Sequence, residues 1–345
     1  MKLSLLHRPD VPPSASPYRL VDQQGQEIAW ANDFLDAQRI RQCSLCSLRA
    51  FGYDLLHFAR WWQQHPSCTL LEMNESTLLD YVRDQLNEEP QPTPQTINHR
   101  LTVLRSLYRF HSGHPLPTGP GHVGGSHYTR STLGYGRWRR VVSSRLRLKE
   151  PKRVIVPLSA EEVAKFWESF HTFRDLALVA LLLVNGLRSR EALALKLQDL
   201  KLADGQVCVL GKGNKQRVLP LPPETITALQ NYLSLERPLT NSPYLFVCLK
   251  GRQRGRAMTV AGLRSLFRHH RLRSEVLRAN PHRLRHTFGS DMVRNGISLP
   301  ALQKLMGHSQ IQTTMLYVQL APQDVWREYG QAVQKRIRLA VPQDL

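Results

Sequence analysis

A stretch rich in glycine and proline interrupts the sequence after its first third. It reads GHPLPTGPGHVGGSHY and begins at Gly113. Both residue types break helices and strands, so neither neighbouring segment is expected to extend through it. A chain of 345 residues also exceeds the length at which a single hydrophobic core usually stops growing. The sequence therefore predicts two domains joined by a linker, which we place at residues 116–153.

Before this linker, apolar residues recur at helical spacing. Between Leu48 and Trp62 they fall at alternating steps of three and four, which is typical of an amphipathic helix. A second helix is predicted over residues 74–86 with Asn74 as its N-cap, and a third over residues 93–113. These segments predict a small all-helical domain at residues 27–115, preceded by a largely irregular, proline-containing extension at residues 1–26.

After the linker, helical segments alternate with a few short strands. The segment RDLALVALLLVNGLR is apolar on every side from Leu176 to Val184, which predicts a buried helix. Ser159 and Glu162 have the spacing of a capping box at a helix start. The stretch GQVCVLGKGNKQRVLPL predicts a β-hairpin, and YLFVCL predicts one more strand.

The predicted fold class is thus mainly α with a small β-sheet (α+β). We expect a second domain at residues 154–322 and a tail helix at residues 323–345. No segment approaches the ~18 uninterrupted apolar residues of a membrane-spanning helix, so no membrane association is expected. The five cysteines are scattered, which favours a reducing cytoplasm over a disulfide scaffold.

The charge balance indicates the class of partner. Lysine and arginine total 47 against 27 acidic residues, a net charge of +20 that favours a nucleic acid. Residues 130–153 hold nine of these cations and a single acid, interleaved with Tyr135 and Trp138. A solvated linker is the alternative, but the aromatic residues favour a strand that contacts DNA. The predicted DNA-binding residues are Arg100, Arg105, Arg130, Arg137, Arg139, Arg140, Arg145, Arg147 and Lys215.

Several polar residues stand at the ends of predicted elements in the second domain. They are Arg188, Glu191, Lys212, His282, Arg285, His308 and Tyr317. Each alone has an ordinary explanation, such as a surface ion pair, a solvated turn, a helix cap or a core tyrosine. Together they suit phosphoryl transfer, because arginine and lysine stabilise a pentacoordinate phosphate and a tyrosine hydroxyl can attack it. A lysine or histidine can protonate the leaving 5′-oxygen.

Other chemistries lack their motifs. No carboxylate cluster with metal-ligand spacing is present, which disfavours a Mg²⁺-dependent nuclease. The glycine-rich phosphate loop that ends in Gly-Lys-Ser/Thr is also missing, so ATP is not implied. Cys43 and Cys46 form one C-x-x-C without a second pair, so zinc is a minor alternative. We therefore expect neither a metal nor a cofactor.

Four segments together carry a family resemblance: NGLRSREAL, LGKGNKQRVLPL, PHRLRHTFG and LMGHSQIQTTMLY. With them the chain resembles the tyrosine recombinases of the phage-integrase and Xer class. Residue by residue, the resemblance implies that the catalytic residues are Arg188, Lys212, His282, Arg285, His308 and the nucleophile Tyr317, with Glu191 as a supporting acid. Tyr329 is the competing candidate for the nucleophile.

The resemblance also implies a function and an assembly. We expect site-specific cutting and rejoining of double-stranded DNA through a 3′-phosphotyrosyl intermediate and a Holliday junction. The helical domain and the catalytic domain would form a C-shaped clamp around DNA. Four subunits would join two duplexes, with the tail helix on a neighbouring subunit and possible accessory proteins.

The long N-terminal extension and linker favour a mobile element over chromosome maintenance, in a cytoplasmic, nucleoid-associated setting. Two alternatives remain at this point. One is a DNA-binding accessory protein without catalysis, and the other is a relaxing enzyme like a type IB topoisomerase.

Overall fold

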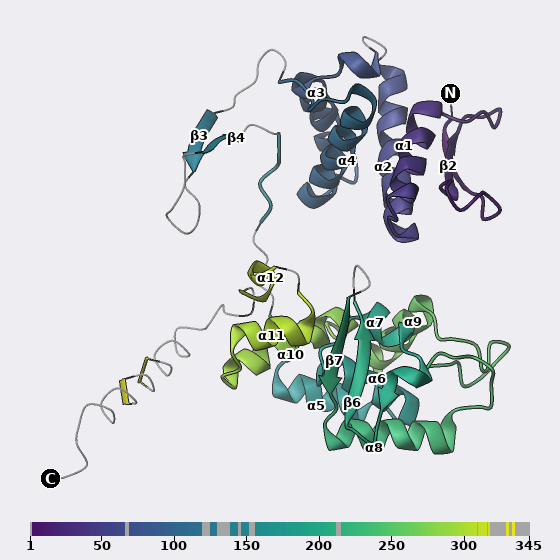
Figure 1. The fold of residues 1–345 in the computed structure, drawn as a ribbon, viewed down its shortest axis with the longest axis vertical. Helices are drawn as coiled ribbons and strands as arrows, with labels where there is room; N and C mark the ends of the chain where they lie inside the picture. The colour runs from purple at the N-terminus through teal and green to yellow at the C-terminus, as the bar shows by residue number, and fades with distance from the viewer. Residues whose placement is uncertain are drawn as a thin grey trace. The chain divides into compact units, whose positions relative to one another are not determined.

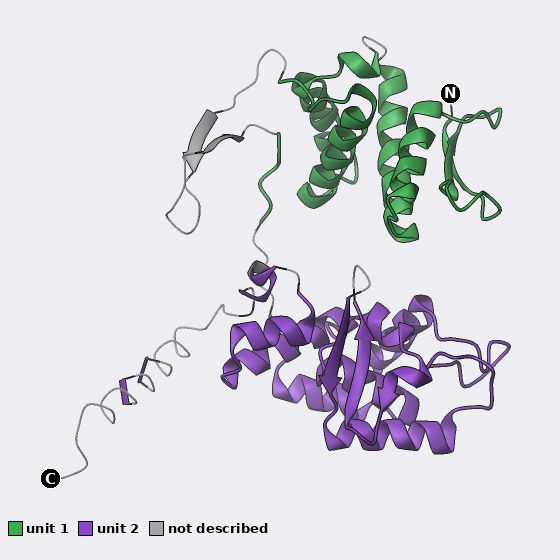
Figure 2. Cartoon of the chain, in the orientation of Figure 1, with its two compact units in different colours: residues 1–152 green, residues 153–345 purple. Residues whose placement is uncertain are grey.

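The computed structural model divides the chain into two compact units, residues Met1–Lys152 and Arg153–Leu345 (Figure 2). Each unit has its own hydrophobic core. The structure describes residues 2–65, 69–118, 125–129, 139–143, 146–151, 156–211, 215–308, 310–315, 317, 329–330 and 333–334. For residues 125–129 and 139–143 this description covers the backbone alone.

Unit 1 is built on four helices that pack side by side (Figure 1). Its elements are β1 (Ser4–His7), β2 (Tyr18–Val21), α1 (Ala29–Ile40), α2 (Leu45–Gln64), the 3₁₀ turn η1 (Leu70–Glu72), α3 (Glu75–Leu86), α4 (Pro94–Ser112), β3 (Gly125–Thr129) and β4 (Arg139–Ser143). The predicted helices are confirmed. Asn74 caps α3 as expected, because its Oδ1 accepts hydrogen bonds from the backbone of Ser76 and Thr77 at 2.9 and 3.2 Å.

The N-terminal extension differs from its irregular prediction. Strands β1 and β2 form an antiparallel hairpin with Ser4 opposite Val21 and His7 opposite Tyr18. The hairpin packs on α2, where a Cβ at Gly52 would lie 2.8 Å from a methyl carbon of Leu5. The prolines that suggested irregular chain lie between the two strands, so they do not interrupt the pairing.

The end of the predicted linker returns to unit 1. The side chain of Asn98 on α4 donates to the Leu148 carbonyl at 3.0 Å and accepts from the Leu148 amide at 2.9 Å. Leu146 and Leu148 also pack against the core of this unit. Residues 146–150 therefore belong to unit 1 by their contacts.

Unit 2 surrounds helix α6 with helices and a three-stranded antiparallel sheet in the order β5-β6-β7 (Figure 1). Its elements are α5 (Ala160–Glu168), α6 (Phe173–Leu183), α7 (Ser189–Ala194), the 3₁₀ turn η2 (Leu197–Asp199), β5 (Leu200–Lys201), β6 (Gln206–Leu210), β7 (Gln216–Pro220), α8 (Pro223–Asn231), the π-helical turn η3 (Tyr232–Glu236), α9 (Val260–Arg273), α10 (Pro281–Arg294), α11 (Leu299–Met306) and α12 (Ile311–Met315).

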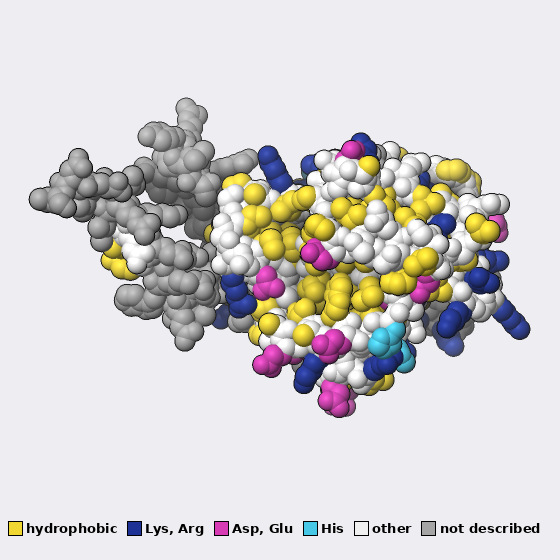
Figure 3. All heavy atoms as spheres, turned by 90° about the horizontal axis from the view of Figure 1, so that it is seen from below, with side chains coloured by type: hydrophobic (Ala, Val, Ile, Leu, Met, Phe, Trp, Pro, Cys, Tyr) yellow, Lys and Arg dark blue, Asp and Glu magenta, His cyan; other side chains and the backbone are white. Residues whose placement is uncertain are grey.

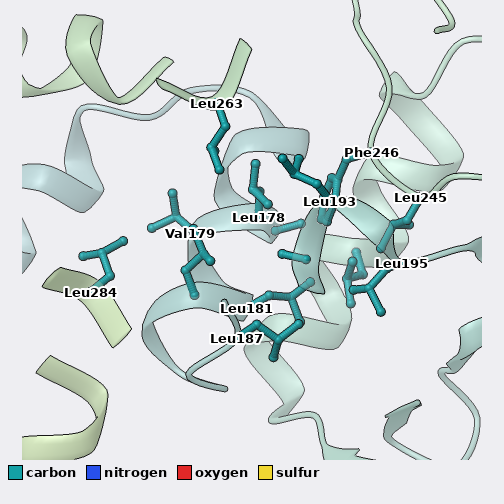
Figure 4. Close-up of a cluster of buried hydrophobic side chains, with 14 of the residues drawn as sticks. Leu178, Val179, Leu181, Leu187, Leu193, Leu195, Leu245, Phe246, Leu263 and Leu284 are labelled. Atoms are coloured by element: carbon teal, nitrogen blue, oxygen red, sulfur yellow. The ribbon is translucent and has the colours of Figure 1, made fainter. Parts of the chain in front are cut away.

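The buried helix, the capping box and the hairpin are confirmed. Leu178, Val179 and Leu181 of α6 are fully buried and converge with residues of other elements in the core (Figure 4). Ser159 and Glu162 cap α5 reciprocally. Strands β6 and β7 pair from Gln206 opposite Pro220 to Leu210 opposite Gln216.

The strand predicted over YLFVCL is wrong. Only isolated bridges occur there, which pair Tyr244 with Lys196, Val247 with Ala257 and Cys248 with Arg254. The apolar residues that suggested a strand lie in the core instead, where Leu245, Phe246 and Val247 are all fully buried. Periodicity alone does not distinguish a short buried segment from a strand.

No helix in the described part of the chain is long and apolar enough to cross a membrane. Apolar side chains are interspersed with polar atoms over the face of the molecule in Figure 3, and many lysines and arginines lie towards its edges.

Candidate active site

Six of the seven residues predicted for the catalytic centre are described by the structure, and all six lie in unit 2. Arg188 is the N-cap of α7 and Glu191 lies in its first turn. His282 and Arg285 share helix α10. His308 follows Gly307, the C-cap of α11, and Tyr317 follows α12. The seventh, Lys212, lies outside the described residues.

A buried glutamate organises three arginines. The carboxylate of Glu191, 6% exposed, accepts a hydrogen bond from Arg188 Nη1 at 2.7 Å. It accepts two more from Arg217 at 3.1 and 2.8 Å, and Arg285 Nη1 lies 3.9 Å away. Burial raises the pKa of Glu191, but hydrogen bonds from Arg217 and the Arg188 backbone outweigh this, so its pKa lies below the ordinary value. We call these four residues the Glu191 cluster.

The same arginines cap the C-terminus of α11. Arg217 Nε donates to the Leu305 carbonyl at 2.9 Å, and Arg285 Nη2 donates to the Met306 carbonyl at 2.6 Å. Arg188 reaches the Met306 and Gly307 carbonyls at 3.3 Å. The last carbonyls of a helix lack intrahelical partners and carry partial negative charge, so cations are favoured there. This places His308 beside the arginines.

Arg285 is the most enclosed of the three, at 3% exposure. It donates to the carbonyl of Gly186 as well as to Met306. Burial and the neighbouring Arg188 lower the pKa of Arg285 to about 10. It therefore stays charged at neutral pH, and its Nη2 also lies 2.9 Å from His308 Nε2.

The Arg285 contact fixes the tautomer of His308. A guanidinium only donates hydrogen bonds, so His308 Nε2 must accept and the ring proton resides on Nδ1. Nδ1 in turn lies 2.9 Å from the hydroxyl oxygen of Thr314. Burial, followed by Arg285 and Arg188, lowers the pKa of His308 to about 4, so the ring is neutral at pH 7.

A pair of histidines lies on α10. The Nε2 atoms of His282 and His286 are 2.8 Å apart, so one donates and the other accepts. Burial and nearby cations lower the pKa of both, that of His286 to about 4. Within the described part of the chain, the buried Nδ1 of His286 has no hydrogen-bond partner.

Tyr317 is seated against α10 and is 8% exposed. A Cβ at Gly289 would lie 2.8 Å from the Tyr317 ring, so the absence of a side chain there makes room for it. The ring stacks with His308 at a centroid distance of 6.2 Å and lies 5.4 Å from the ring of His286. Burial raises the pKa of Tyr317, while Arg285 and Arg188 favour the phenolate and oppose the rise.

The cluster carries more positive than negative charge. Three arginines surround one carboxylate, and no second acid is bonded to them in the described part of the structure. An anion that enters beside Tyr317 therefore meets an excess of preorganised donors. Among the described residues, no group of three His, Cys, Asp or Glu side chains is placed to hold a metal ion, and this includes Cys43 and Cys46.

Sequence reasoning missed Arg217 and His286. Arg217 lies in β7 among exposed residues, where an arginine ordinarily points to solvent. The available signal was its position in the same hairpin as Lys212. His286 follows His282 by four residues on a helix, a spacing that puts both on one face and could have been noticed.

The predicted DNA-binding residues divide into three groups. Arg147 and Lys215 are exposed. Arg100 and Arg105 are enclosed, each with a side chain 15% exposed. Arg100 donates to Gln85 at 2.6 Å and Arg105 binds Glu75 with two hydrogen bonds, which does not support their predicted contact with DNA. The side chains that lie outside the described residues are those of Arg130, Arg137, Arg139, Arg140 and Arg145.

Comparisons with known proteins identify the family of the chain. The sequence model of the Phage integrase family matches residues 145–324, slightly more than half of the chain, and that of the phage integrase N-terminal SAM-like domain matches residues 32–112. The chain is 29% identical over 329 residues to tyrosine recombinase XerC of Chlorobaculum parvum, covering 86% of this chain and 91% of that protein.

Two further similarities are more limited. Tyrosine recombinase XerD of Staphylococcus haemolyticus is 33% identical over 195 residues, a match that covers 53% of this chain and 64% of that protein, slightly under two thirds. The crystal structure of the XerH recombinase bound to a palindromic difH substrate superposes with a TM-score of 0.63 at 20% identity, covering 85% of this chain and 82% of that one. At this identity the superposition shows a shared fold.

Proposed function

Because the chain belongs to the phage integrase family of DNA strand-transferring tyrosine recombinases, we propose that it is a site-specific recombinase with Tyr317 as its nucleophile. The observation that carries the assignment is the Glu191 cluster beside the seated Tyr317 ring. The Tyr317 oxygen attacks a DNA phosphorus, the bond from phosphorus to the 5′-oxygen breaks, and a 3′-phosphotyrosyl link forms. Attack by a 5′-hydroxyl of another strand reverses these steps and restores a phosphodiester.

Each charged group then has a defined task. Arg188 and Arg285 hold the non-bridging oxygens, whose negative charge grows in the transition state. Neutral His308 accepts a hydrogen bond from Arg285 through Nε2 and so helps to orient this arginine for the phosphate. His282 takes the tyrosine proton, and Lys212 protonates the leaving 5′-oxygen. The free energy of the phosphodiester is kept in the covalent link, so no cofactor is required.

The assembly is part of the same proposal. Units 1 and 2 form a clamp around a double-stranded recombination site, and four subunits join two duplexes through the tail helix of residues 323–345. The substrates belong to a mobile element, and the protein works in the cytoplasm on DNA. Support comes from the net charge of +20 and from the match of residues 32–112 to the SAM-like domain.

Loss of the nucleophile tests the chemistry. Tyr317→Phe keeps the ring that packs on Gly289 and removes only the hydroxyl. We expect it to bind a nicked suicide substrate normally and to form no covalent adduct, as resolved by denaturing electrophoresis. Tyr329→Phe, whose ring is 63% exposed, is the matched control and should form the adduct at the normal rate.

The outcomes of this assay are decisive. An adduct in Tyr317→Phe that disappears in Tyr329→Phe would move the nucleophile to Tyr329. Binding of target DNA without any adduct in the unmodified protein would instead favour a non-catalytic accessory protein. Relaxation of plasmids that lack a target site would favour the topoisomerase alternative.

A further inference from the structure

Arg217 joins parts of the site that are far apart in the sequence. Its side chain is 12% exposed and lies on β7. Two of its nitrogens bind the two oxygens of Glu191, and the third donates to the Leu305 carbonyl at the end of α11. One planar guanidinium therefore links the sheet, the first turn of α7 and the last turn of α11.

The same guanidinium occupies the space beside the two glycines that precede two proposed catalytic side chains. A Cβ at Gly307 would lie 2.9 Å from Arg217 Nη1, and one at Gly211 would lie 3.4 Å from the same atom. Gly307 stands directly before His308, and Gly211 directly before Lys212. The left-handed backbone at Gly307, with φ of +62°, lets the turn pass this close to the arginine.

Arg217 also completes the coordination of Glu191. The carboxylate can accept about four hydrogen bonds, and two of these come from Arg217. The others come from Arg188, through Nη1 at 2.7 Å and the backbone amide at 2.9 Å. The orientation of the carboxylate, and with it the position of Arg188, therefore depends on Arg217.

From these contacts we propose that Arg217 is a positioning residue for the reaction. It fixes the Gly307–His308 turn and the Glu191 carboxylate relative to one another and makes no contact with DNA. This inference rests on the proposed function, since it concerns the placement of His308 and Arg188 at the phosphate. Small displacements of such groups slow a reaction strongly while substrate binding is retained.

The test compares Arg217→Met with Arg237→Met. Arg237 is a suitable control because it also donates to several carbonyls of unit 2, those of Leu245, Ser242 and Tyr244, and shares no hydrogen-bond partner with the Glu191 cluster among the described residues. We expect Arg217→Met to slow single-turnover adduct formation at saturating DNA by about tenfold or more, with DNA affinity within about threefold of normal. Arg237→Met should lower the melting temperature and leave the adduct rate unchanged.

A double-mutant cycle identifies the route of the effect. If Arg217 acts through His308, combining Arg217→Met with His308→Asn should slow the reaction much less than the product of the two single effects. Arg217→Lys keeps the charge but cannot span Glu191 and Leu305 together, so it should not restore the rate. Full recovery by lysine, strict additivity, or equal slowing by Arg237→Met would each overturn the proposal.

A measurement without DNA separates this proposal from the proposed function. In the free protein, the NMR signal of the His308 ring should shift and titrate differently in Arg217→Met and not in Arg237→Met. That result supports the positioning role even if the unmodified protein forms no adduct. An unchanged His308 signal in Arg217→Met overturns the positioning role even if Tyr317 proves to be the nucleophile.

Discussion

Each unit buries a glutamate against arginine, but the number of arginines that surround the glutamate differs. In unit 1, Glu75 is 7% exposed and Arg105 holds both of its oxygens at 2.8 and 2.6 Å. In unit 2, Glu191 is similarly buried at 6% but is shared among Arg188, Arg217 and Arg285. The first pair is electrically neutral, whereas the second group keeps two positive charges unmatched.

This difference is the one expected between a structural contact and the phosphate site that we propose. A neutral, doubly hydrogen-bonded pair has little left to offer a phosphate, and its role is to join α3 to α4. An unbalanced cluster holds its donors in place through one carboxylate and still attracts an anion. Exposure alone would mislead here, because Arg285 is more deeply buried than Arg105.

The largest expected difference in reaction rate is between two variants, each of which removes one arginine from one of the two units. Arg285→Ala should slow adduct formation at saturating DNA by about two orders of magnitude or more, because a preorganised donor to the phosphate is lost. Arg105→Ala should leave the rate within about threefold and lower the free energy of unfolding by about 3 kcal/mol, because Glu75 stays buried without its cation.

Single-turnover kinetics and thermal melting of both variants measure the expected changes in rate and stability. Should Arg105→Ala keep its melting temperature and lose DNA affinity in a salt-dependent way, Arg105 would be a phosphate contact as the sequence predicted. The ratio of arginines to glutamates would then be a poor guide to function.

The sequence predicted local structure well and the direction of side chains less well. The apolar run of α6, the Ser159 cap and the β6–β7 hairpin follow from patterns within a few residues, and all three are present. Arg105 and Arg217 show the limit. Both stand beside apolar positions of regular elements, and whether each turns inward depends on a glutamate from another element, Glu75 or Glu191.

The same limit explains the extension and the strand that was predicted but is absent. Whether residues 1–26 pair depends on the surface of α2 that receives Leu5, and the prolines obscured this possibility. Leu245, Phe246 and Val247 are buried, but residues 244–249 pair with neighbouring backbone only through isolated bridges. By contrast, Arg188, Arg285, His308 and Tyr317 lie together in unit 2 although they are far apart in the sequence. The family resemblance could indicate this grouping because it reflects tertiary proximity, which local patterns do not.

A smaller effect should follow from filling the space beneath Tyr317. Gly289→Ala places a methyl group where the ring now lies, 2.8 to 2.9 Å from three of its carbons. Alanine otherwise favours a helix by roughly 0.5–1 kcal/mol over glycine. We therefore expect adduct formation to slow by about tenfold while the melting temperature changes little, since the ring is displaced and the helix is not disrupted.

The matched control is Gly262→Ala on helix α9. There a new Cβ would meet its nearest neighbour, Thr259 Oγ1, at an ordinary 3.6 Å. This variant should react at the normal rate. Normal kinetics in Gly289→Ala as well would mean that Tyr317 leaves this seat before the rate-limiting step, and the enclosed ring would then describe only the resting protein.

The smallest effect concerns the protonation of histidines, which should differ between the two units. Burial and nearby cations lower the pKa of His286 and of His308 to about 4 in the folded protein, whereas an unfolded histidine titrates near 6.5. The unfolded chain therefore binds more protons between these values, so the stability that these rings contribute is complete above about pH 6.5 and is lost as pH falls towards 4. Discounted for partial exposure, the loss is roughly 1 kcal/mol per histidine between pH 7 and pH 5.

Binding of DNA should oppose this effect at His308 but not at a histidine of unit 1. A phosphate held by Arg188 and Arg285 offsets the positive field that disfavours the imidazolium, so the pKa of His308 should rise by about one unit or more. In unit 1, burial and then Arg100 lower the pKa of His57, while Glu88 opposes that shift. Because no bound phosphate is proposed there, the pKa of His57 should stay constant when DNA binds. Titration of both rings by NMR, with and without DNA bound to Tyr317→Phe, measures the difference. Equal shifts at the two histidines would show that DNA acts through its general field, and the charge excess of the Glu191 cluster would then not mark the phosphate site.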